Sequence, residues 1–177
     1  MKTASTVLVV MLCALSSIAG CVITPHPEYV SRKGATSREA DLVVPAAHGT
    51  YRIRSVLDGE VITGPKAAAE QYVGVDDDRG RAPQRWKLIP AGARKFQLQV
   101  SDVGYCLADH GSGVLEEVCN AQDRDQQWLI VQHQGHYEIM FRDSEKCLGV
   151  GGRGKLVDLE CHGTVDQLWD FVPVSGP

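Results

Sequence analysis

Four of the six cysteines form two pairs whose spacings suit either covalent cross-linking or metal binding. The first pair is Cys106 with Cys119, and the second is Cys147 with Cys161, whose separation is longer by a single residue. A structural zinc site uses closer pairs of cysteines than these. Because the chain also opens with an export signal, the spacings favour two disulfides, Cys106 to Cys119 and Cys147 to Cys161. Each bridge would close a short loop and contribute on the order of 3 kcal/mol to stability.

Other groups that could hold a metal or attack a substrate are less well placed. The run from Asp76 to Asp78 lacks the alternating acidic positions and the distal glutamate of a calcium loop, so a solvated loop is expected. His133 and His136 flank Gly135, which indicates a turn with two surface histidines. No serine, cysteine or aspartate stands in a recognisable nucleophile motif. The sequence therefore predicts no metal, no cofactor and no enzyme activity.

The elements that must position these residues follow a repeat. All three tryptophans stand in Gln-x-Trp tripeptides, and the two intervals between them are equal within one residue. These tripeptides are Gln84-Arg85-Trp86, Gln126-Gln127-Trp128 and Gln167-Leu168-Trp169. A repeat of this length is one supersecondary unit that cannot bury its apolar face alone, so three copies are expected to pack together.

Each unit begins with an aromatic residue that leads an alternating polar and apolar run. These runs are 51–54, 96–99 and 137–140, and each predicts a half-buried strand. In the first unit, further strands are expected at 60–62, 72–75 and 86–89, with a turn at Asp58-Gly59. Four strands in each of three units predict an all-β domain of twelve strands.

The first twenty residues have the plan of an export signal. Lys2 is followed by an apolar run from Val7 to Leu15, which is too short to span a bilayer. The sequence Ile18-Ala19-Gly20-Cys21 resembles the lipobox of bacterial lipoproteins, in which the cysteine is lipidated. The alternative is an ordinary signal peptide cleaved after Ala19. Cys21 has no partner in the pairs above, which favours lipidation and an outer-membrane or cell-surface lipoprotein over a simply secreted protein.

The remaining chain divides into an arm and a repeat domain. Residues 21–48 contain Pro25, Pro27 and Pro45 without sustained periodicity, so they are expected to form a lipidated, flexible tether. An alternative is that residues 22–48 wrap a protein partner. The domain is expected to fill residues 49–177. The formal net charge of −4 has the wrong sign for a nucleic-acid surface, so nucleic acid is not an expected partner.

Three units of about forty residues with Gln-x-Trp endings, two of them with a Cys-Leu to Cys pair, resemble the ricin B-type β-trefoil lectins. The resemblance covers residues 49–173. It implies a β-trefoil, which is a six-stranded barrel capped by three hairpins. It also implies that the three tryptophans lie in the core and that the three glutamines brace turns.

The resemblance further implies where a sugar would bind. In the family, a site combines an acidic residue just after Cys-Leu, an aromatic ring two residues before the second cysteine, and Asn or Asp beside the Gln of Gln-x-Trp. A carboxylate accepts hydrogen bonds from vicinal hydroxyls, and the ring stacks on the sugar. Unit two offers Asp109, one residue later than the pattern, Glu117 at the ring position, and Asp125 beside Gln126. These four residues are the candidate site.

The other two units depart further from the pattern. Unit three keeps Asp166 but has Gly149 after Cys-Leu and Leu159 at the ring position. Unit one has Pro83 before its Gln and Val75 at the ring position. Only unit two is therefore expected to bind a sugar.

Three functions follow as hypotheses. The first is a non-catalytic, carbohydrate-binding module on an exported, lipid-anchored protein that holds glycans at a membrane surface. The second is a toxin-assembly or cell-surface-binding subunit, because the lipobox, the arm and Cys147-Leu148-Gly149 are similar to the delivery subunits of cytolethal distending toxin. The third is a protease inhibitor, because residues 49–54 with Asp58-Gly59 resemble the opening of fungal trefoil inhibitors. The cysteine pairs and the Gln-x-Trp set argue against the third.

Overall fold

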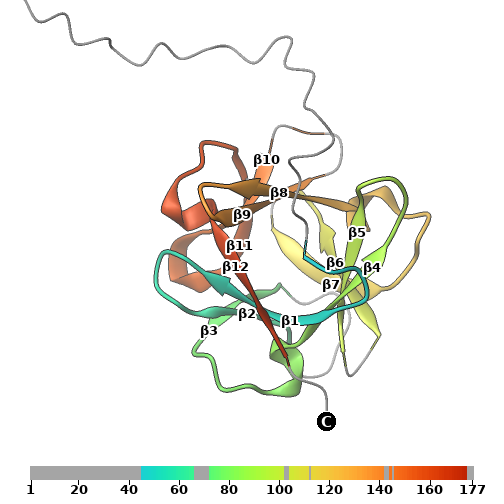
Figure 1. Cartoon of the computed structure of the whole chain (residues 1–177), viewed down its shortest axis with the longest axis horizontal. Coiled ribbons are helices and arrows are strands. Elements are labelled where there is room, and N and C mark those ends of the chain that lie inside the picture. The colour runs from blue at the N-terminus through green and yellow to red at the C-terminus, as the bar shows by residue number, and fades with distance from the viewer. Residues whose placement is uncertain are drawn as a thin grey trace, which may run out of the picture. The chain divides into compact units, whose positions relative to one another are not determined.

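The computed structural model describes residues 45–65, 72–101, 104–111, 113–141, 144 and 146–174 (Figure 1). The chain divides into two units, Met1–Ser37 and Arg38–Pro177, and every described residue belongs to the second. The predicted signal peptide, Cys21 and the arm as far as residue 44 lie outside the described residues. Among the described residues, no helix is long and apolar enough to cross a bilayer.

Six antiparallel strands close into a barrel. Each strand pairs with the next in the list, and the last pairs with the first. They are β1 (Thr50–Ser55), β4 (Trp86–Pro90), β5 (Phe96–Val100), β8 (Trp128–His133), β9 (His136–Phe141) and β12 (Trp169–Pro173). Figure 1 shows β1 and β12 crossing side by side, which joins the first unit of the repeat to the last.

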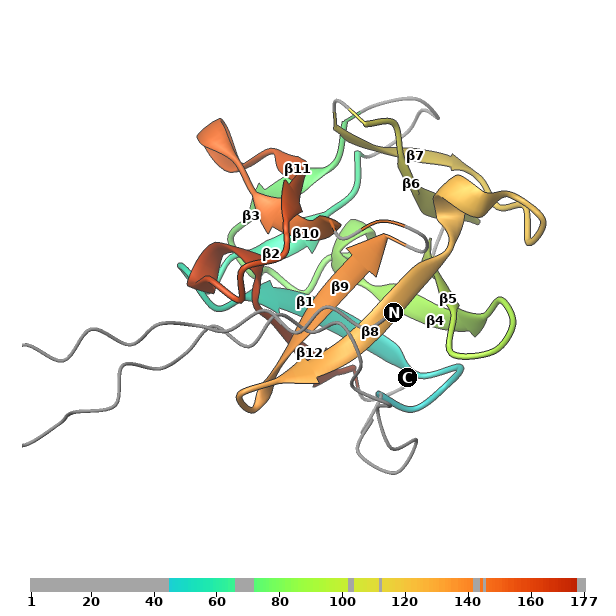
Figure 2. The same ribbon diagram turned by 90° about the horizontal axis from the view of Figure 1, so that it is seen from above.

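The other six strands form three antiparallel hairpins, one in each unit. They are β2 (Val61–Thr63) with β3 (Gly74–Asp76), β6 (Tyr105–Asp109) with β7 (Val114–Val118), and β10 (Lys146–Val150) with β11 (Leu156–Glu160). Figure 2 shows the three hairpins together on one side of the barrel. The twelve strands, the six-stranded barrel and the hairpin cap confirm the predicted β-trefoil.

Short 3₁₀ turns precede the last strand of each unit. These are η2 (Ala82–Gln84), η3 (Arg124–Gln126) and η5 (Val165–Gln167), and a fourth, η4 (Gly152–Gly154), lies between β10 and β11. The glutamine at the end of each of the first three turns is buried. Gln84 accepts a hydrogen bond from the Arg81 backbone N–H at 3.2 Å and donates one to the Asp77 carbonyl at 2.7 Å. These bonds satisfy backbone groups of the turn, as expected for bracing residues.

The three tryptophans occupy equivalent places in the core, as predicted. Trp86, Trp128 and Trp169 are each 0% exposed. Their indole N–H groups donate to the carbonyls of Ile62, Leu107 and Leu148 at 2.9, 2.9 and 3.0 Å. Each acceptor is in the hairpin of the same unit, so every tryptophan ties a barrel strand to its own hairpin. A buried indole needs such a partner, because an unpaired N–H in the core is costly.

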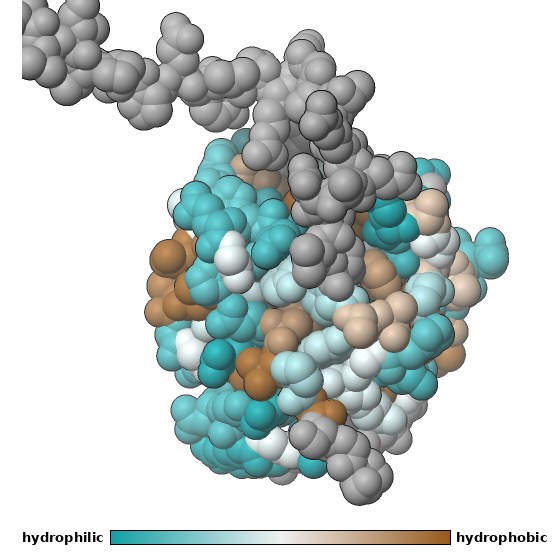
Figure 3. Space-filling view, in the orientation of Figure 1, coloured by the Kyte–Doolittle hydropathy of each residue, from teal (hydrophilic) through white to brown (hydrophobic). Residues whose placement is uncertain are grey.

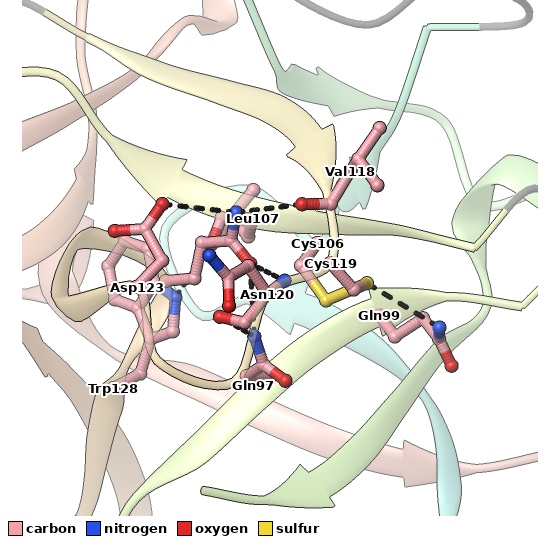
Figure 4. The surroundings of a disulfide bond; sticks show 10 residues. Gln97, Gln99, Cys106, Leu107, Val118, Cys119, Asn120, Asp123 and Trp128 are labelled. Carbon is pink, nitrogen blue, oxygen red and sulfur yellow. Dashed lines mark hydrogen bonds between the residues drawn. A yellow bond between two sulfur atoms is a disulfide. The ribbon is translucent and has the colours of Figure 1, made fainter.

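Both predicted disulfides are present. One joins Cys106 to Cys119 and the other joins Cys147 to Cys161. In each bridge the first cysteine is in the hairpin, and the second lies one residue beyond its end. Figure 4 shows the first bridge, where the side-chain amide of Gln99 lies 3.5 Å from the Cys119 sulfur.

The third strand of unit one begins later than predicted. β3 starts at Gly74, whereas a strand was expected from Tyr72. Tyr72 instead forms an isolated antiparallel bridge with Leu115 of β7. The Val73 N–H donates to the Val114 carbonyl at 2.8 Å, and the Val73 carbonyl accepts from the Leu156 N–H at 3.1 Å. This segment therefore links all three hairpins, which local sequence alternation cannot reveal.

Candidate functional site

The β6–β7 hairpin of unit two has two faces with different surroundings. Cys106 pairs with Glu117, and Ala108 pairs with Leu115. Because side chains alternate along a strand and direct partners share a face, these four side chains lie on one face. We call this the outer face. The opposite face of the hairpin, which carries Glu116, is the inner face.

The polar group of the outer face is a histidine and glutamate pair. The Nε2 atom of His110 lies 2.7 Å from the Oε1 atom of Glu117. The two side chains are 41% and 27% exposed, so the pair is open to solvent. Because position 110 stands opposite Gly113 at the turn, the imidazole must reach back past Ala108 to meet Glu117. The small Ala108 side chain leaves room for it.

His110 was not among the candidate residues predicted from the sequence. The family pattern directs attention to the residues just after Cys-Leu, and His110 lies beyond that stretch. His110 follows Cys106 and Ala108 at intervals of two residues, and this spacing is the signal that could have identified it. The alternation of side chains places such a residue on the same face as Glu117.

Asp109 does not join this pair, contrary to the expectation that Asp109 and Glu117 would share one site. Its register partner is Val114, which puts it on the inner face. Its Oδ1 atom accepts a hydrogen bond from the Gly111 N–H at 2.7 Å. Burial raises the pKa of Asp109, and this is the largest effect. The hydrogen bond from Gly111 lowers the pKa by less, and the charges of Asp158 and Asp125 raise it slightly further. A one-residue shift from the family position thus moves the carboxylate to the other side of the hairpin.

The last two predicted site residues lie on η3, beside β6. Asp125 is exposed, and its N–H donates to the Oδ1 atom of Asp123 at 3.0 Å. Gln126 is 1% exposed, and its amide bonds the Val118 carbonyl at 3.0 Å and the Asn120 N–H at 2.9 Å. Asp125 can therefore meet a ligand from solvent. The amide of Gln126 serves the turn instead.

A sequence profile described as the ricin-type beta-trefoil lectin domain matches residues 49–169. The chain belongs to this family. The match contains all three units, both disulfides and the complete outer face of unit two. A search among curated proteins finds no match to this lectin-family chain.

Solved structures share the lectin fold at low sequence identity. The designed threefold-symmetric protein ThreeFoil is 21% identical with a TM-score of 0.63, over 71% of this chain and 99% of its own. Cytolethal distending toxin from Actinobacillus actinomycetemcomitans is 16% identical with a TM-score of 0.65, over 73% and 94%. The Polyporus squamosus lectin, solved with the epitope Neu5Aca2-6Galb1-4GlcNAc, is 18% identical with a TM-score of 0.63, over 72% and 50%. These likenesses show the fold alone.

In unit three of the lectin domain, the face equivalent to the outer face is filled by an apolar side chain. A Cβ atom at Gly149 would lie 2.7 Å from the Cδ1 atom of Leu159 and 3.3 Å from the Asp166 carbonyl oxygen. Leu159 therefore lies across Gly149, next to η5. The place where unit two offers a carboxylate is occupied in unit three by a methyl group.

The remaining polar groups singled out in the sequence serve the lectin scaffold. Asp78 pairs with Arg52 at 3.1 Å, and Asp77 pairs with Arg79 at 3.0 Å. His133 and His136 face each other across the turn between β8 and β9. Among the described residues, no three potential ligands gather in a way that could hold a metal ion.

Proposed function

We propose that the protein is a carbohydrate-binding module whose sugar site is the outer face of the β6–β7 hairpin. Membership of the ricin-type lectin family supports this reading. The observation that carries it is the exposed His110 and Glu117 pair, which stands where unit three has Leu159 packed on Gly149. Sugar hydroxyls need exposed polar partners, and unit two presents them on this face.

The chemistry of the pair suits vicinal hydroxyl groups. The Glu117 carboxylate accepts hydrogen bonds, and a carboxylate can accept from two neighbouring hydroxyls at once. The His110 imidazole has a second ring nitrogen that can donate or accept, depending on its tautomer. Asp125, exposed on the η3 turn, interacts electrostatically with Asp109 of the inner face and does not belong to the pair. No step of this role requires a reaction, and we propose a binding function without catalysis.

The affinity of one such site is expected to be weak. Position 117 carries a carboxylate in place of the aromatic ring that the family pattern puts there. A single site is therefore expected to bind a monosaccharide with a Kd in the millimolar range, which is about −4 kcal/mol. Display of many copies on one surface would raise the effective strength through avidity.

A glycan array tests this function. The full-length protein is expected to bind at least one printed glycan, and His110→Ala and Glu117→Ala are each expected to remove the signal. Leu159→Ala is the matched control, because it opens the equivalent face of unit three without supplying polar groups. Equal binding by wild type and both unit-two variants would overturn the assignment to this face.

We also propose that the protein is exported and anchored by lipid at Cys21, with the surface of an outer membrane or cell as its location. The lipobox-like sequence 18–21 supports the anchor. Two disulfides within the domain support an oxidising compartment. In a bacterial host, incorporation of a palmitate analogue is expected for wild type and not for Cys21→Ser. Equal labelling of both forms would reject the anchor.

The toxin-subunit hypothesis is the alternative, and exposed apolar side chains favour it. Leu57 after β1 is 48% exposed and Val165 on η5 is 53% exposed. On the face that Figure 3 shows, hydrophilic residues predominate outside the grey atoms, and the hydrophobic ones are scattered. A protein partner would bind at exposed apolar side chains such as Leu57 and Val165. Retained partner binding by His110→Ala, with no glycan bound by wild type, would favour this alternative.

A further inference from the structure

An aromatic side chain of unit one lies against the turn of the unit-two hairpin. Tyr72 is 53% exposed, and among the described residues it is the only exposed tyrosine, phenylalanine or tryptophan. Its backbone forms an antiparallel bridge with Leu115 of β7, so β7 is flanked by β6 on one side and by Tyr72 on the other. A single exposed apolar side chain is ordinary on a protein surface, so the significance of Tyr72 depends on the groups around its ring.

The Tyr72 ring lies on the outer face. Bridge partners in an antiparallel pair share a face, so Tyr72 is on the same side as Leu115, and Leu115 is on the same side as Glu117. A Cβ atom at Gly113 would be 2.5 Å from the Cε1 atom and 2.7 Å from the Cδ1 atom of the Tyr72 ring. The ring therefore rests on the bare backbone of Gly113. Gly113 stands opposite His110, since the His110 N–H donates to the Gly113 carbonyl at 3.1 Å.

A cation accompanies the ring. The Nζ atom of Lys155 lies 5.2 Å from the centroid of the Tyr72 ring, within the range of a cation–π contact. Lys155 follows η4 of unit three, and it pairs with Gly74, two residues after Tyr72. Its ammonium group can donate up to three hydrogen bonds. An apolar ring and a donor thus stand together at the end of the outer face away from Glu117.

The order along this face is the ring, then the imidazole, then the carboxylate. Tyr72 is a diagonal neighbour of Glu117 on β7, a relation that puts their Cβ atoms somewhat less than about 7–8 Å apart, and the ring leans further away toward Gly113. One sugar bonded to His110 and Glu117 cannot also cover Tyr72. A second sugar linked to it can, with its C–H groups against the exposed part of the ring and its hydroxyls near Lys155.

From this geometry we propose that Tyr72 and Lys155 form a second subsite, so that the outer face binds glycans of two or more residues more tightly than monosaccharides. The proposal rests on the sugar-binding function of the His110 and Glu117 pair. In this arrangement, Tyr72 of unit one provides the stacking ring that unit two lacks at position 117. The selected ligand class is an oligosaccharide with an accessible C–H face on the residue next to the one held by Glu117.

The test compares each monosaccharide with its own disaccharide on full-length protein. Galactose, N-acetylglucosamine and mannose are titrated beside lactose, chitobiose and mannobiose. Wild type is expected to bind at least one disaccharide about ten-fold more tightly than the matching monosaccharide, the gain expected from one stacked ring. Tyr72→Ala is expected to erase that ratio, and Tyr72→Phe to keep it. Gly113→Ala is expected to erase it as well, because its methyl group displaces the ring without changing Tyr72.

Leu57→Ala serves as the control, because Leu57 is also an exposed apolar residue but belongs to the turn after β1. A ratio that survives both Tyr72→Ala and Gly113→Ala would overturn the second subsite. If His110→Ala still abolished binding in that case, the proposed sugar-binding function would stand without the second subsite. If wild type bound none of the six sugars, both the function and the subsite would fall.

Discussion

Units two and three of the trefoil share a scaffold and differ in what their hairpins present. Both have a disulfide, a buried tryptophan and a bracing glutamine in equivalent places. On one face of the hairpin, unit two has His110 bonded to Glu117, whereas unit three has Leu159 lying across Gly149. On a common frame, the face is therefore polar and open to solvent in unit two and closed by an apolar contact in unit three.

The inner faces differ as well. Glu116 pairs in register with Leu107, and the equivalent Asp158 pairs with Leu148. Asp158 forms an ion pair with Lys146. Glu116 is 1% exposed, and its Oε1 atom has no hydrogen-bond partner among the described residues. Burial raises the pKa of Glu116 to about 7. The same position therefore carries a paired charge in one unit and an isolated carboxyl in the other.

Loss of a core tryptophan is expected to have the largest effect on stability. The effect should be similar in units two and three, because the tryptophan is equally buried in both. Trp128→Ala and Trp169→Ala each remove a fully buried indole, which typically costs about 3–5 kcal/mol. That is a large part of a usual stability of about 5–15 kcal/mol. Trp86→Ala, in the unit without a disulfide, is expected to be tolerated least. Urea unfolding measures all three, and a variant within about 1 kcal/mol of wild type would show that its tryptophan is not structural.

Removal of either disulfide should have similar effects in the two units. Cys106→Ser with Cys119→Ser opens a loop of nearly the same length as Cys147→Ser with Cys161→Ser. Each double variant is expected to lose about 3 kcal/mol, because the unfolded chain regains its freedom. Unfolding in denaturant compares them under oxidising conditions. A loss in only one unit would show that the two bridges are not equivalent.

The buried carboxyl of Glu116 should make the stability of the domain depend on pH. Below about pH 4.5, Glu116 is protonated in both the folded and the unfolded state, so it has no effect. As pH rises to about 7 the unfolded chain ionises first, and the folded state loses stability on the order of 3 kcal/mol, with the loss complete above pH 7. Glu116→Gln is therefore expected to match wild type at pH 4 and to exceed it at pH 8. Urea unfolding at both values measures this, and an equal difference at pH 4 and pH 8 would refute it.

The smallest effects on folding, and the sharpest on function, are expected at the outer face. His110→Ala and Glu117→Ala change exposed side chains, so their melting temperatures should stay near that of wild type while sugar binding is lost. Asp109→Ala is expected to retain most of the binding, because Asp109 belongs to the inner face. Thermal melts and glycan arrays on the same samples measure both properties. Loss of binding in Asp109→Ala, with binding retained in His110→Ala and Glu117→Ala, would show that the sugar site is on the inner face.

The sequence was sufficient for the scaffold because the scaffold repeats. Evenly spaced tryptophans, two cysteine pairs and alternating strands each point to the same architecture. The proposed site was harder to predict, because it depends on which face of the hairpin a side chain occupies. Asp109 and His110 are neighbours in the chain, yet strand alternation sends one toward Lys146 and Asp158 and the other toward Glu117. Tyr72 could not be assigned from the sequence, since its contact with Gly113 joins different units.

The most direct test of the sugar site is an NMR titration of the isotopically labelled protein with the best disaccharide from the comparison above. Binding is expected to shift the resonances of Ala108, His110, Leu115 and Glu117 in a saturable way. The equivalent positions of unit three, Gly149 and Leu159, should remain unshifted. Saturable shifts confined to unit three or to the inner face, or no shifts with any of the sugars, would contradict a sugar site on the outer face of unit two.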